Sequence, residues 1–308
     1  MTFNYNHLYY FYITAKLNGV SAAARHLHTS QSSLSTQLKV LEGHVGRKLL
    51  QRSGRKLKLT HDGHIVYSYC KRIFEPAEEM GAFLANKQEA LLRRIVIGVS
   101  QEIERPFVTD VVARVLRDVS TNQSYSVKLM SSSHTTLLNR LSLHEIDLLL
   151  TTQYTYKSEF IKICEVAWPV VLVASPKILE KLKSPVRTLA DFKKVDANLV
   201  LPTADLLLRH EIDGFIHKSG MQNRVVFESN ILSAIHRAVL DGLGFGFLLF
   251  PSVMNEVRKN QLRIIGNKLL WSHEYFLLST PQKARDPFTL ELKNALEGFQ
   301  SAVLSRMN

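Results

Sequence analysis

Four basic side chains are concentrated in one short segment near the N-terminus, around the turn-forming pair Ser53-Gly54. The segment reads RKLLQRSGRKLKLT and predicts two short strands, Leu49–Gln51 and Lys56–Leu59, on either side of that turn. The basic residues of this hairpin are Arg52, Arg55, Lys56 and Lys58. Lys and Arg on a hairpin can hold the phosphate oxygens of a nucleic acid backbone. A solvated hairpin whose charges serve only solubility is the alternative.

A second set of polar side chains lies just upstream, in the segment QSSLSTQLKVLEGHVG. Leu34, Leu38 and Leu41 fall on one face of a helix, and the remaining faces are polar. Hydroxyl, amide and ammonium groups on a helix can read base edges in the major groove of DNA. The candidate DNA-binding residues here are Ser30, Gln31, Ser32, Ser33, Ser35, Thr36 and Lys39.

A helix-turn-helix would hold these side chains in place. Helical spacing of apolar residues predicts a first helix over 8–17, which Asn18-Gly19 ends. Ser21 is expected to cap a second helix, Ala22–Leu27, and Ser30 to cap the third after a short break. Two short helices around a tight turn, followed by a basic hairpin, predict a winged helix-turn-helix over residues 1–60. Without the hairpin, any small helical hairpin would fit equally well.

The charge distribution agrees with a polyanionic partner for this segment. The formal net charge of the chain is +12, and residues 1–63 carry nine Lys or Arg against two acidic residues. Residues 95–308 carry 25 basic and 21 acidic residues, so the excess positive charge is concentrated near the N-terminus. Double-stranded DNA is therefore the expected partner.

The next segment predicts a long helix that can pair with a second copy of itself. Thr60 is expected to cap it, and apolar residues follow at steps of three and four, as in a coiled coil. Pro76 should kink or divide this helix. A helix packed only on its own domain is the alternative. We expect residues 61–90 to form a linker and dimerisation helix, with the seam Val66, Tyr69, Ile73, Ala77, Met80 and Leu84.

From Arg93 onward, strands and helices alternate, which predicts an α/β domain over residues 91–308. The first expected strands are RRIVIGVS, Tyr125–Met130 and Asp147–Thr151, with helices from Pro106 to Val119 and over Thr135–Leu143. A second unit is expected to place strands at Asn198–Leu201, Arg224–Phe227 and Phe245–Phe250, with helices at Ala204–Lys218 and Ile231–Leu240. A strand at Glu274–Thr280 and a helix at Phe288–Leu304 close the chain.

Two lobes are expected, lobe I from about 91–163 and 269–308, and lobe II from about 164–268. Ligands of such folds bind beyond the carboxyl ends of the strands, in the cleft between lobes. The strand-end residues expected to bind a small effector are Ser100, Gln101, Thr151, Thr152, Thr203 and Phe247. The helix opened by Pro106 adds an N-terminus that favours an anion. Simple strand-end capping is the alternative role for these residues.

The stretch from Ala23 to Gly63 resembles the DNA-binding signature of LysR-type transcriptional regulators. The matching motifs are Ala23-Ala24, Leu27, Ser30-Gln31-Ser32, Ser35, Leu41-Glu42, Gly46, Leu49-Leu50-Gln51-Arg52 and Thr60-His61-Asp62-Gly63. IVIGVS, EIDLLL, Pro176 after VLVAS, and GLGFGFLLFP extend the resemblance over nearly the whole chain. It implies a winged helix-turn-helix, a long linker helix and a two-lobed effector domain like that of periplasmic binding proteins.

The sequence departs from the family pattern at three positions, and it also resembles one subgroup of the family. Ser32 stands where the family usually has Pro, Thr36 where Arg is common, and Leu50 where Phe is usual. The segments NYNHLYYF and VYSYCKRIFEPAEEM resemble the subgroup that activates sodium–proton antiporter genes. That subgroup implies a response to sodium or alkaline pH, although no acidic cluster is evident in the expected cleft. The family further implies homodimers or homotetramers and, for an activator, contact with RNA polymerase.

Two other classes were weighed. An enzyme is disfavoured because no nucleophile elbow, phosphate loop or metal-ligand spacing is present, and Gly242–Gly246 leads into a strand instead of following one. A periplasmic solute-binding protein is disfavoured by the basic N-terminal domain and by the lack of a recognisable signal peptide. No apolar run is long enough for a membrane span, and Cys70 and Cys164 form no disulfide framework. We expect a cytoplasmic regulator without metal, cofactor or enzymatic activity.

Overall fold

The computed structural model describes residues 4–53, 56–84, 93–119, 125–266 and 269–306. The chain divides into two compact units, one made mainly of the residues up to Arg93 and the other of Arg94 onward. Each unit encloses its own buried apolar clusters, as separate domains do.

The N-terminal unit, called the head, is a winged helix-turn-helix followed by a long helix. Its elements are α1 (Tyr5–Lys16), α2 (Val20–His26), α3 (Gln31–Val45), β1 (Leu50–Ser53), β2 (Lys56–Leu59) and α4 (His61–Leu84). The predicted helices and hairpin are confirmed, and β1 pairs antiparallel with β2. The predicted cap of the second helix is wrong: Gly19 is the N-cap, and the Ser21 hydroxyl donates to Gln31 Oε1 instead.

The head core joins all its helices. Phe11 and Tyr12 from α1, Ala23 and Ala24 from α2, and Leu34 from α3 are almost fully buried together. Cys70 of α4 belongs to the same core, so the first half of the long helix packs as part of the head. Tyr12 and Phe74 lie with ring centroids 5.5 Å apart and strengthen this packing.

The long helix α4 is continuous through Pro76, so the expected division at that residue is wrong. Pro76 and Arg72 are both exposed. Pro76 has no N–H to donate to the carbonyl of Arg72, so this one bond is missing from the hydrogen-bond ladder of the helix. The predicted cap is confirmed, because Thr60 Oγ1 accepts a hydrogen bond from the Gly63 N–H at 2.9 Å.

The second unit is built on one nine-stranded sheet with the main order β4-β3-β5-β11-β6-β9-β7-β8, and β10 pairs with β6. The elements of lobe I are β3 (Arg93–Ser100), α5 (Arg105–Val119), β4 (Tyr125–Ser132), α6 (His134–Ser142), β5 (Leu148–Thr151) and α12 (Pro287–Ser305). Strand β3 pairs parallel with β5, as the alternation of strands and helices predicts.

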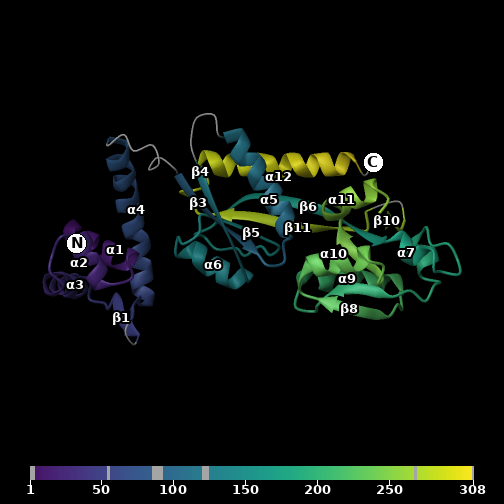
Figure 1. The fold of residues 1–308 in the computed structure, drawn as a ribbon, viewed down its shortest axis with the longest axis horizontal. Helices are drawn as coiled ribbons and strands as arrows, with labels where there is room; N and C mark the ends of the chain where they lie inside the picture. The colour runs from purple at the N-terminus through teal and green to yellow at the C-terminus, as the bar shows by residue number, and fades with distance from the viewer. Residues whose placement is uncertain (1–3, 54–55, 85–92, 120–124, 267–268, 307–308) are drawn as a thin grey trace. The chain divides into compact units, whose positions relative to one another are not determined.

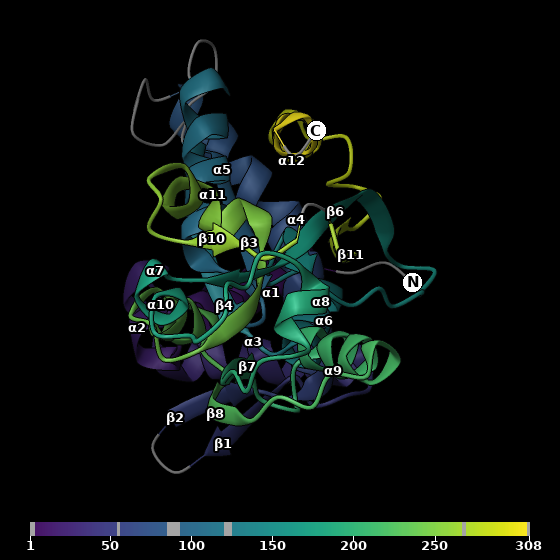
Figure 2. The ribbon, with the colours of Figure 1, turned by 90° about the vertical axis from the view of Figure 1, so that its right-hand side faces the viewer.

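Helices cover both faces of the lobe I sheet. Leu148 and Leu150 of β5 pack with α5 and α12, whereas Leu149 packs with α6 on the opposite face. This alternation follows from the two-residue period of a strand, and it explains the uninterrupted apolar run of β5. In both views α5 and α12 lie on one side of the sheet and α6 lies on the other (Figures 1 and 2).

Lobe II repeats the parallel arrangement. Its elements are α7 (Pro176–Leu179), α8 (Leu189–Phe192), β7 (Leu199–Pro202), α9 (Leu207–Ser219), β8 (Val225–Ser229), α10 (Leu232–Leu240), β9 (Phe245–Leu249), α11 (Phe250–Arg258) and β10 (Arg263–Ile264). Strand β7 lies between β8 and β9 and is parallel to both, which confirms the second predicted unit. The sequence analysis did not predict α11, which follows β9 directly.

Two long antiparallel strands connect the lobes. Strand β6 (Ile161–Ala174) was not predicted as a strand, and β11 (Trp271–Ser279) is longer than the predicted Glu274–Thr280. The two strands pair along most of their length, from Trp271 opposite Val170 to Ser279 opposite Ile161. At one end β11 pairs with β5 of lobe I, and at the other β6 pairs with β9 of lobe II. The lobes therefore share one continuous hydrogen-bonded sheet.

Gly63 is a position in the head where the backbone leaves no room for a side chain. A Cβ atom there would lie 2.0 Å from the carbonyl oxygen of Leu49, far inside van der Waals contact. We expect Gly63→Ala to lower the free energy of unfolding of the head by about 1–3 kcal/mol through overpacking. Amide hydrogen exchange in residues 5–60 of the full chain measures the change.

Gly43→Ala is the matched control, because nothing lies within 4 Å of a Cβ built at this helical position. It should leave the stability of the head unchanged or raise it by about 0.5–1 kcal/mol, the usual gain for Ala over Gly in a helix. Equal exchange protection in the two variants would contradict the close approach of α4 to β1.

Candidate nucleic-acid interface and effector cleft

The exposed side of α3 carries most of the residues predicted to read DNA bases. Leu34, Leu38 and Leu41 are buried on one side of the helix. Ser32, Thr36 and Lys39 are exposed, and their spacing of four and three residues places them together on the opposite side. Gln31 is also exposed, and Ser35 is partly buried at the edge of this surface. The surface formed by Gln31, Ser32, Ser35, Thr36 and Lys39 is called the α3 face.

Short hydrogen bonds fix the start of α3. Ser30 is the N-cap, as predicted, and its hydroxyl accepts from the Ser33 N–H. The hydroxyls of Ser30 and Ser32 lie 3.0 Å apart, so Ser32 at the family's Pro position adds to the cap. Ser33 itself lines a small pocket against α1, beside Asn4, His7 and Tyr10. The structure therefore separates Ser33 from the α3 face.

Glu42 holds the wing, the hairpin β1–β2, against the end of α3. Its Oε1 accepts hydrogen bonds from the backbone N–H groups of Leu49 and Leu50, and its Oε2 accepts one from Lys48 Nζ at 2.7 Å. Partial burial raises the pKa of this carboxyl, but the hydrogen bonds outweigh that effect and the pKa is lowered overall. Glu42 therefore stays ionised at neutral pH and positions the wing.

The structure describes the side chains of only some basic residues of the wing. Lys58 is exposed on β2 opposite Gln51. Arg52 and Lys56 lie in β1 and β2, where only their backbone is described, and Arg55 lies outside the described residues. Of the four predicted phosphate ligands, the structure therefore describes the side chain of Lys58, which is exposed.

Helix α4 has two apolar faces of different character. Tyr67, Cys70 and Phe74 pack against the head core, and Glu78 accepts hydrogen bonds from Tyr12 and Lys16 of α1. The other face carries exposed apolar side chains at intervals of four or seven residues: Ile65, Tyr69, Ile73, Met80 and Leu84, whose exposed fractions run from 37% to 72%. Ala77 is exposed with them, whereas Val66 is partly buried in the head core.

In the second unit, Glu102 joins residues from both lobes. The Thr152 hydroxyl of lobe I donates to Glu102 Oε2 at 2.9 Å. The backbone N–H of Leu207, the first residue of α9 in lobe II, donates to the same oxygen at 3.4 Å. Helix α9 has no side-chain cap, so the Glu102 carboxylate lies where the helix N-terminus favours an anion. The ends of β3, β5 and β7 thus meet at this residue, at the position where the sequence predicts the effector site, and this region is called the effector cleft.

A histidine completes the lobe I side of the effector cleft. Hydrogen bonds join His134 Nδ1 to Thr151 Oγ1 at 2.8 Å and His134 Nε2 to Thr155 Oγ1 at 3.0 Å. Burial lowers the pKa of His134, and the nearby charge of Glu102 opposes that shift. Thr151 is therefore buried and already engaged, while Thr152 is bound to Glu102.

Two predicted cleft hydroxyls are buried without a partner among the described residues. They are Ser100 Oγ at the end of β3 and Thr203 Oγ1 just after β7. Gln101 is exposed, and its backbone N–H donates to the Ser132 carbonyl. Phe247 is fully buried in an aromatic cluster with Phe215 and Trp271, so the structure assigns it to the core of lobe II.

Sequence reasoning missed Glu102 and His134, although a signal for the first was present. Glu102 follows a buried strand by two residues, where side chains of α/β folds meet ligands. His134 begins α6, and its contact with Thr151 is set by sheet pairing across 17 residues. The sequence pointed to no acidic cluster in this cleft, and the structure places one carboxylate there, that of Glu102.

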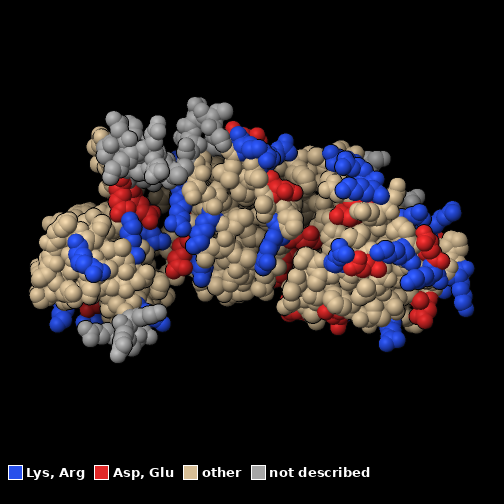
Figure 3. Space-filling model, in the orientation of Figure 1, with Lys and Arg blue, Asp and Glu red and all other residues tan. Residues whose placement is uncertain are grey.

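Within the described residues, no group of three or more His, Cys, Asp or Glu side chains is placed to hold a metal ion. None of the described helices combines the length and the apolar character that crossing a membrane requires. On the face shown in Figure 3, acidic and basic side chains are interspersed over lobe II.

Known proteins resemble this chain in sequence and in fold. The chain is 30% identical to the transcriptional activator protein NhaR of Escherichia coli over 148 residues, which is 48% of each protein. It therefore spans about half the length of that relative. It is 25% identical to the regulator CitR of Bacillus subtilis over 83% of this chain and 85% of CitR.

Solved structures share the fold at lower identity. LysG of Corynebacterium glutamicum, solved with bound effector Arg, superimposes with a TM-score of 0.65 at 15% identity, covering 98% of this chain and 99% of LysG. ArgP of Mycobacterium tuberculosis gives a TM-score of 0.67 at 16% identity, covering 97% and 98%.

Two family models together account for most of the sequence. Residues 5–64 match the bacterial regulatory helix-turn-helix protein of the lysR family, which is the head as far as the start of α4. Residues 88–300 match the LysR substrate-binding domain, which is nearly the whole two-lobed unit. Because these two family models match the head and nearly the whole two-lobed unit, the chain belongs to the family of LysR-type transcriptional regulators.

Proposed function

We propose that this regulator binds a two-fold DNA operator through the α3 face and the wing. The exposed α3 face carries the proposal, because its hydroxyl, amide and ammonium groups lie opposite the buried leucines, where they can meet base edges. Glu42 fixes the wing beside this helix, so Lys58, Arg52, Arg55 and Lys56 can contact phosphates flanking the major groove. Thr36 replaces the family's common Arg and reduces direct guanine contact there.

The proposed functional form is a homodimer through α4, which further pairs into a tetramer. The exposed apolar stripe from Ile65 to Leu84 has the spacing of a coiled-coil seam, and large exposed stripes are usually buried by association. A dimer also brings two α3 helices to the two halves of an operator. The linker and dimerisation segment would extend over 61–90, and Val66 would stabilise the head core instead of the seam.

We further propose that a small effector with an anionic group binds in the effector cleft. The group would take the place of the Glu102 carboxylate at the start of α9, and the buried hydroxyls of Ser100 and Thr203 would donate hydrogen bonds to it. Because Glu102 contacts both lobes, its displacement would change the preferred angle between them.

The narrower function that we propose is activation of sodium–proton antiporter or alkaline-stress genes. Its support is the resemblance of NYNHLYYF and VYSYCKRIFEPAEEM to that subgroup, and the 30% identity to the transcriptional activator NhaR. Glu102 gives the effector cleft one carboxylate that a sodium ion could also contact. Contact with RNA polymerase would follow if the protein activates transcription.

The DNA-binding proposal predicts different effects for two substitutions. Lys58→Ala should weaken binding to every duplex and lower the slope of log affinity against log salt by about one unit, because one phosphate contact is lost. Gln31→Ala should weaken binding to an operator selected from random duplexes by about 1–3 kcal/mol relative to non-specific DNA. Fluorescence anisotropy over a range of salt concentrations measures both.

Lys183→Ala is the control, because Lys183 is exposed in the effector domain and equally charged. Its salt slope should equal that of the unmodified protein. An unchanged slope for Lys58→Ala would remove Lys58 from the phosphate contacts, and uniform weakening by Gln31→Ala would remove Gln31 from base readout.

The dimer proposal predicts that Tyr69→Asp combined with Ile73→Asp separates the head pairs and abolishes operator binding. Two carboxylates in a seam face their counterparts on the second copy, so burial becomes unfavourable. Sedimentation velocity at micromolar concentration measures the assembly. Leu290→Asp with Leu304→Asp, at exposed apolar positions of α12, is the control. If the α4 variant assembles like the unmodified protein, the α4 seam is not the dimer interface.

The effector proposal predicts that Glu102→Gln strengthens binding of small carboxylates by about tenfold, equivalent to about 1.4 kcal/mol, because a competing like charge is removed. Calorimetric titration of the full chain with a panel of carboxylates, and with sodium and lithium, measures this. Glu180→Gln removes the same charge from an exposed site and should change nothing. Carboxylate binding that is equal in both variants would exclude the Glu102 position; sodium binding lost only in Glu102→Gln would support the sodium response instead.

A further inference from the structure

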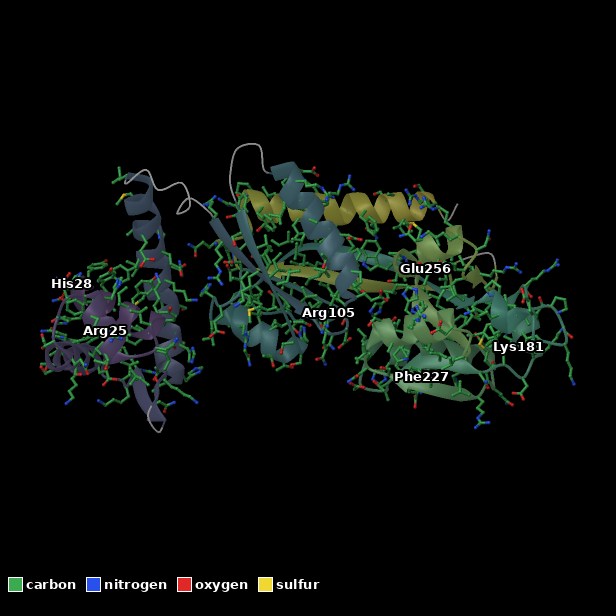
Figure 4. All side chains as sticks on the ribbon, in the orientation of Figure 1. Arg25, His28, Arg105, Lys181, Phe227 and Glu256 are labelled. Atoms are coloured by element: carbon green, nitrogen blue, oxygen red, sulfur yellow. The ribbon has the colours of Figure 1, made fainter. Side chains whose placement is uncertain are left out.

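A second cavity lies between the lobes, lined by residues that differ from those of the effector cleft. Its volume is about 410 Å³, within the usual range for small-molecule sites. Helices α5 and α12 of lobe I and α10 and α11 of lobe II provide its walls. Glu256, one of the lining residues on α11, is labelled in Figure 4. This space is called the helix cavity.

Hydrogen-bond acceptors are concentrated at one end of the helix cavity. Glu104, at the start of α5, accepts a hydrogen bond from Ser252 and lies near His236 and Glu256. Glu256 Oε2 and His236 Nε2 are both buried, and neither has a hydrogen-bond partner among the described residues. The Glu256 Oε1 to His236 Nε2 distance is 3.9 Å, too long for a hydrogen bond between them.

Buried polar atoms without a partner are unfavourable and are uncommon in folded proteins. A carboxylate oxygen can only accept, so Glu256 Oε2 requires a donor. Burial also raises the pKa of Glu104, and the charge of Glu256 acts in the same direction, whereas the hydrogen bond from Ser252 and the charge of His236 act against it. This end of the cavity is therefore suited to a positively charged donor.

The rest of the wall is apolar and aromatic. The Phe107 and Phe299 rings lie with centroids 5.6 Å apart, and Val111 and Ala295 lie beside them on α5 and α12. The basic residues Arg114 and Arg117 lie about three to four turns along α5 from Glu104. The Arg114 side chain is 62% exposed and lies 3.9 Å from Asp118, so it is exposed to solvent instead of buried at the acceptor end.

We propose that the helix cavity is a second ligand site, for an organic amine with an apolar body. The ammonium group donates to Glu256 Oε2 and faces Glu104, and the apolar body packs against Phe107 and Phe299. A charge-assisted hydrogen bond to the buried oxygen of a partly exposed carboxylate supplies specificity, and aromatic contact supplies most of the buried area. The site does not depend on the effector cleft, whose residues do not line it.

The test uses 2-phenylethylamine as the probe and phenylacetate as its anionic counterpart of similar size. Calorimetric titration of the full-length chain should show one amine bound per chain and no phenylacetate in the helix cavity. Glu256→Gln should weaken amine binding by about 10- to 100-fold, the loss expected for one charge-assisted hydrogen bond. Glu291→Gln, which removes an exposed carboxylate of α12 outside the cavity, should leave binding unchanged.

Ala295→Phe tests the site without changing charge, because the larger side chain fills the cavity and should abolish amine binding. It also decides the result if Glu256→Gln fails to fold. Glu102→Gln should not affect the amine, which separates this site from the effector cleft. The proposal is overturned if the unmodified chain does not bind the amine, if binding survives Ala295→Phe, or if Glu102→Gln abolishes it.

Discussion

The antiparallel pairing of β6 and β11 is the constraint on which the arrangement of the second unit depends. Each strand contributes to both lobes, so one hydrogen-bonded ladder fixes where the cleft and the helix cavity can form. Most of the lobe II part of β6 is buried, and Trp168 at its centre contacts Phe107 of α5 and Tyr275 of β11. A change in the angle between lobes must therefore be absorbed by twisting these two strands or by small shifts of the helices packed on them.

In the head, a few backbone contacts have a comparable role. Glu42 binds the N–H groups that begin β1, Thr60 binds the carbonyl of Lys48, and Gly63 allows α4 to approach Leu49. These contacts connect the end of α3 with the wing and the start of α4. The motifs Leu41-Glu42 and Thr60–Gly63 therefore have a structural explanation: they fix the distance between the α3 face and the wing.

The sequence predicted those parts of the fold whose signals are local. The caps Ser30 and Thr60, the leucine spacing of α3 and the basic turn after Arg52 each occupy only a few residues, and the corresponding elements were found. Strand β6 was missed because its pairing partners are far away in sequence and Pro169 interrupts its pattern. Phe247 was placed in the cleft because strand ends usually face ligands, but Phe215 and Trp271 hold it in the core. Contacts among residues so far apart in the sequence cannot be read from the residues next to Phe247.

The loop between β3 and α5 connects the two interlobe sites. Glu102 faces Thr152 and the start of α9, whereas Glu104, two residues later, faces Ser252 and the helix cavity. Ile103 between them is 2% exposed, and its N–H donates to the Ser100 carbonyl, so the loop is anchored in the core of lobe I. One short, anchored segment therefore positions both carboxylates, although they face different sites. The coupling free energy between two binding sites is reciprocal. If binding at one site changes affinity at the other, a ligand of the helix cavity therefore alters effector affinity by the same factor by which the effector alters the affinity of that ligand.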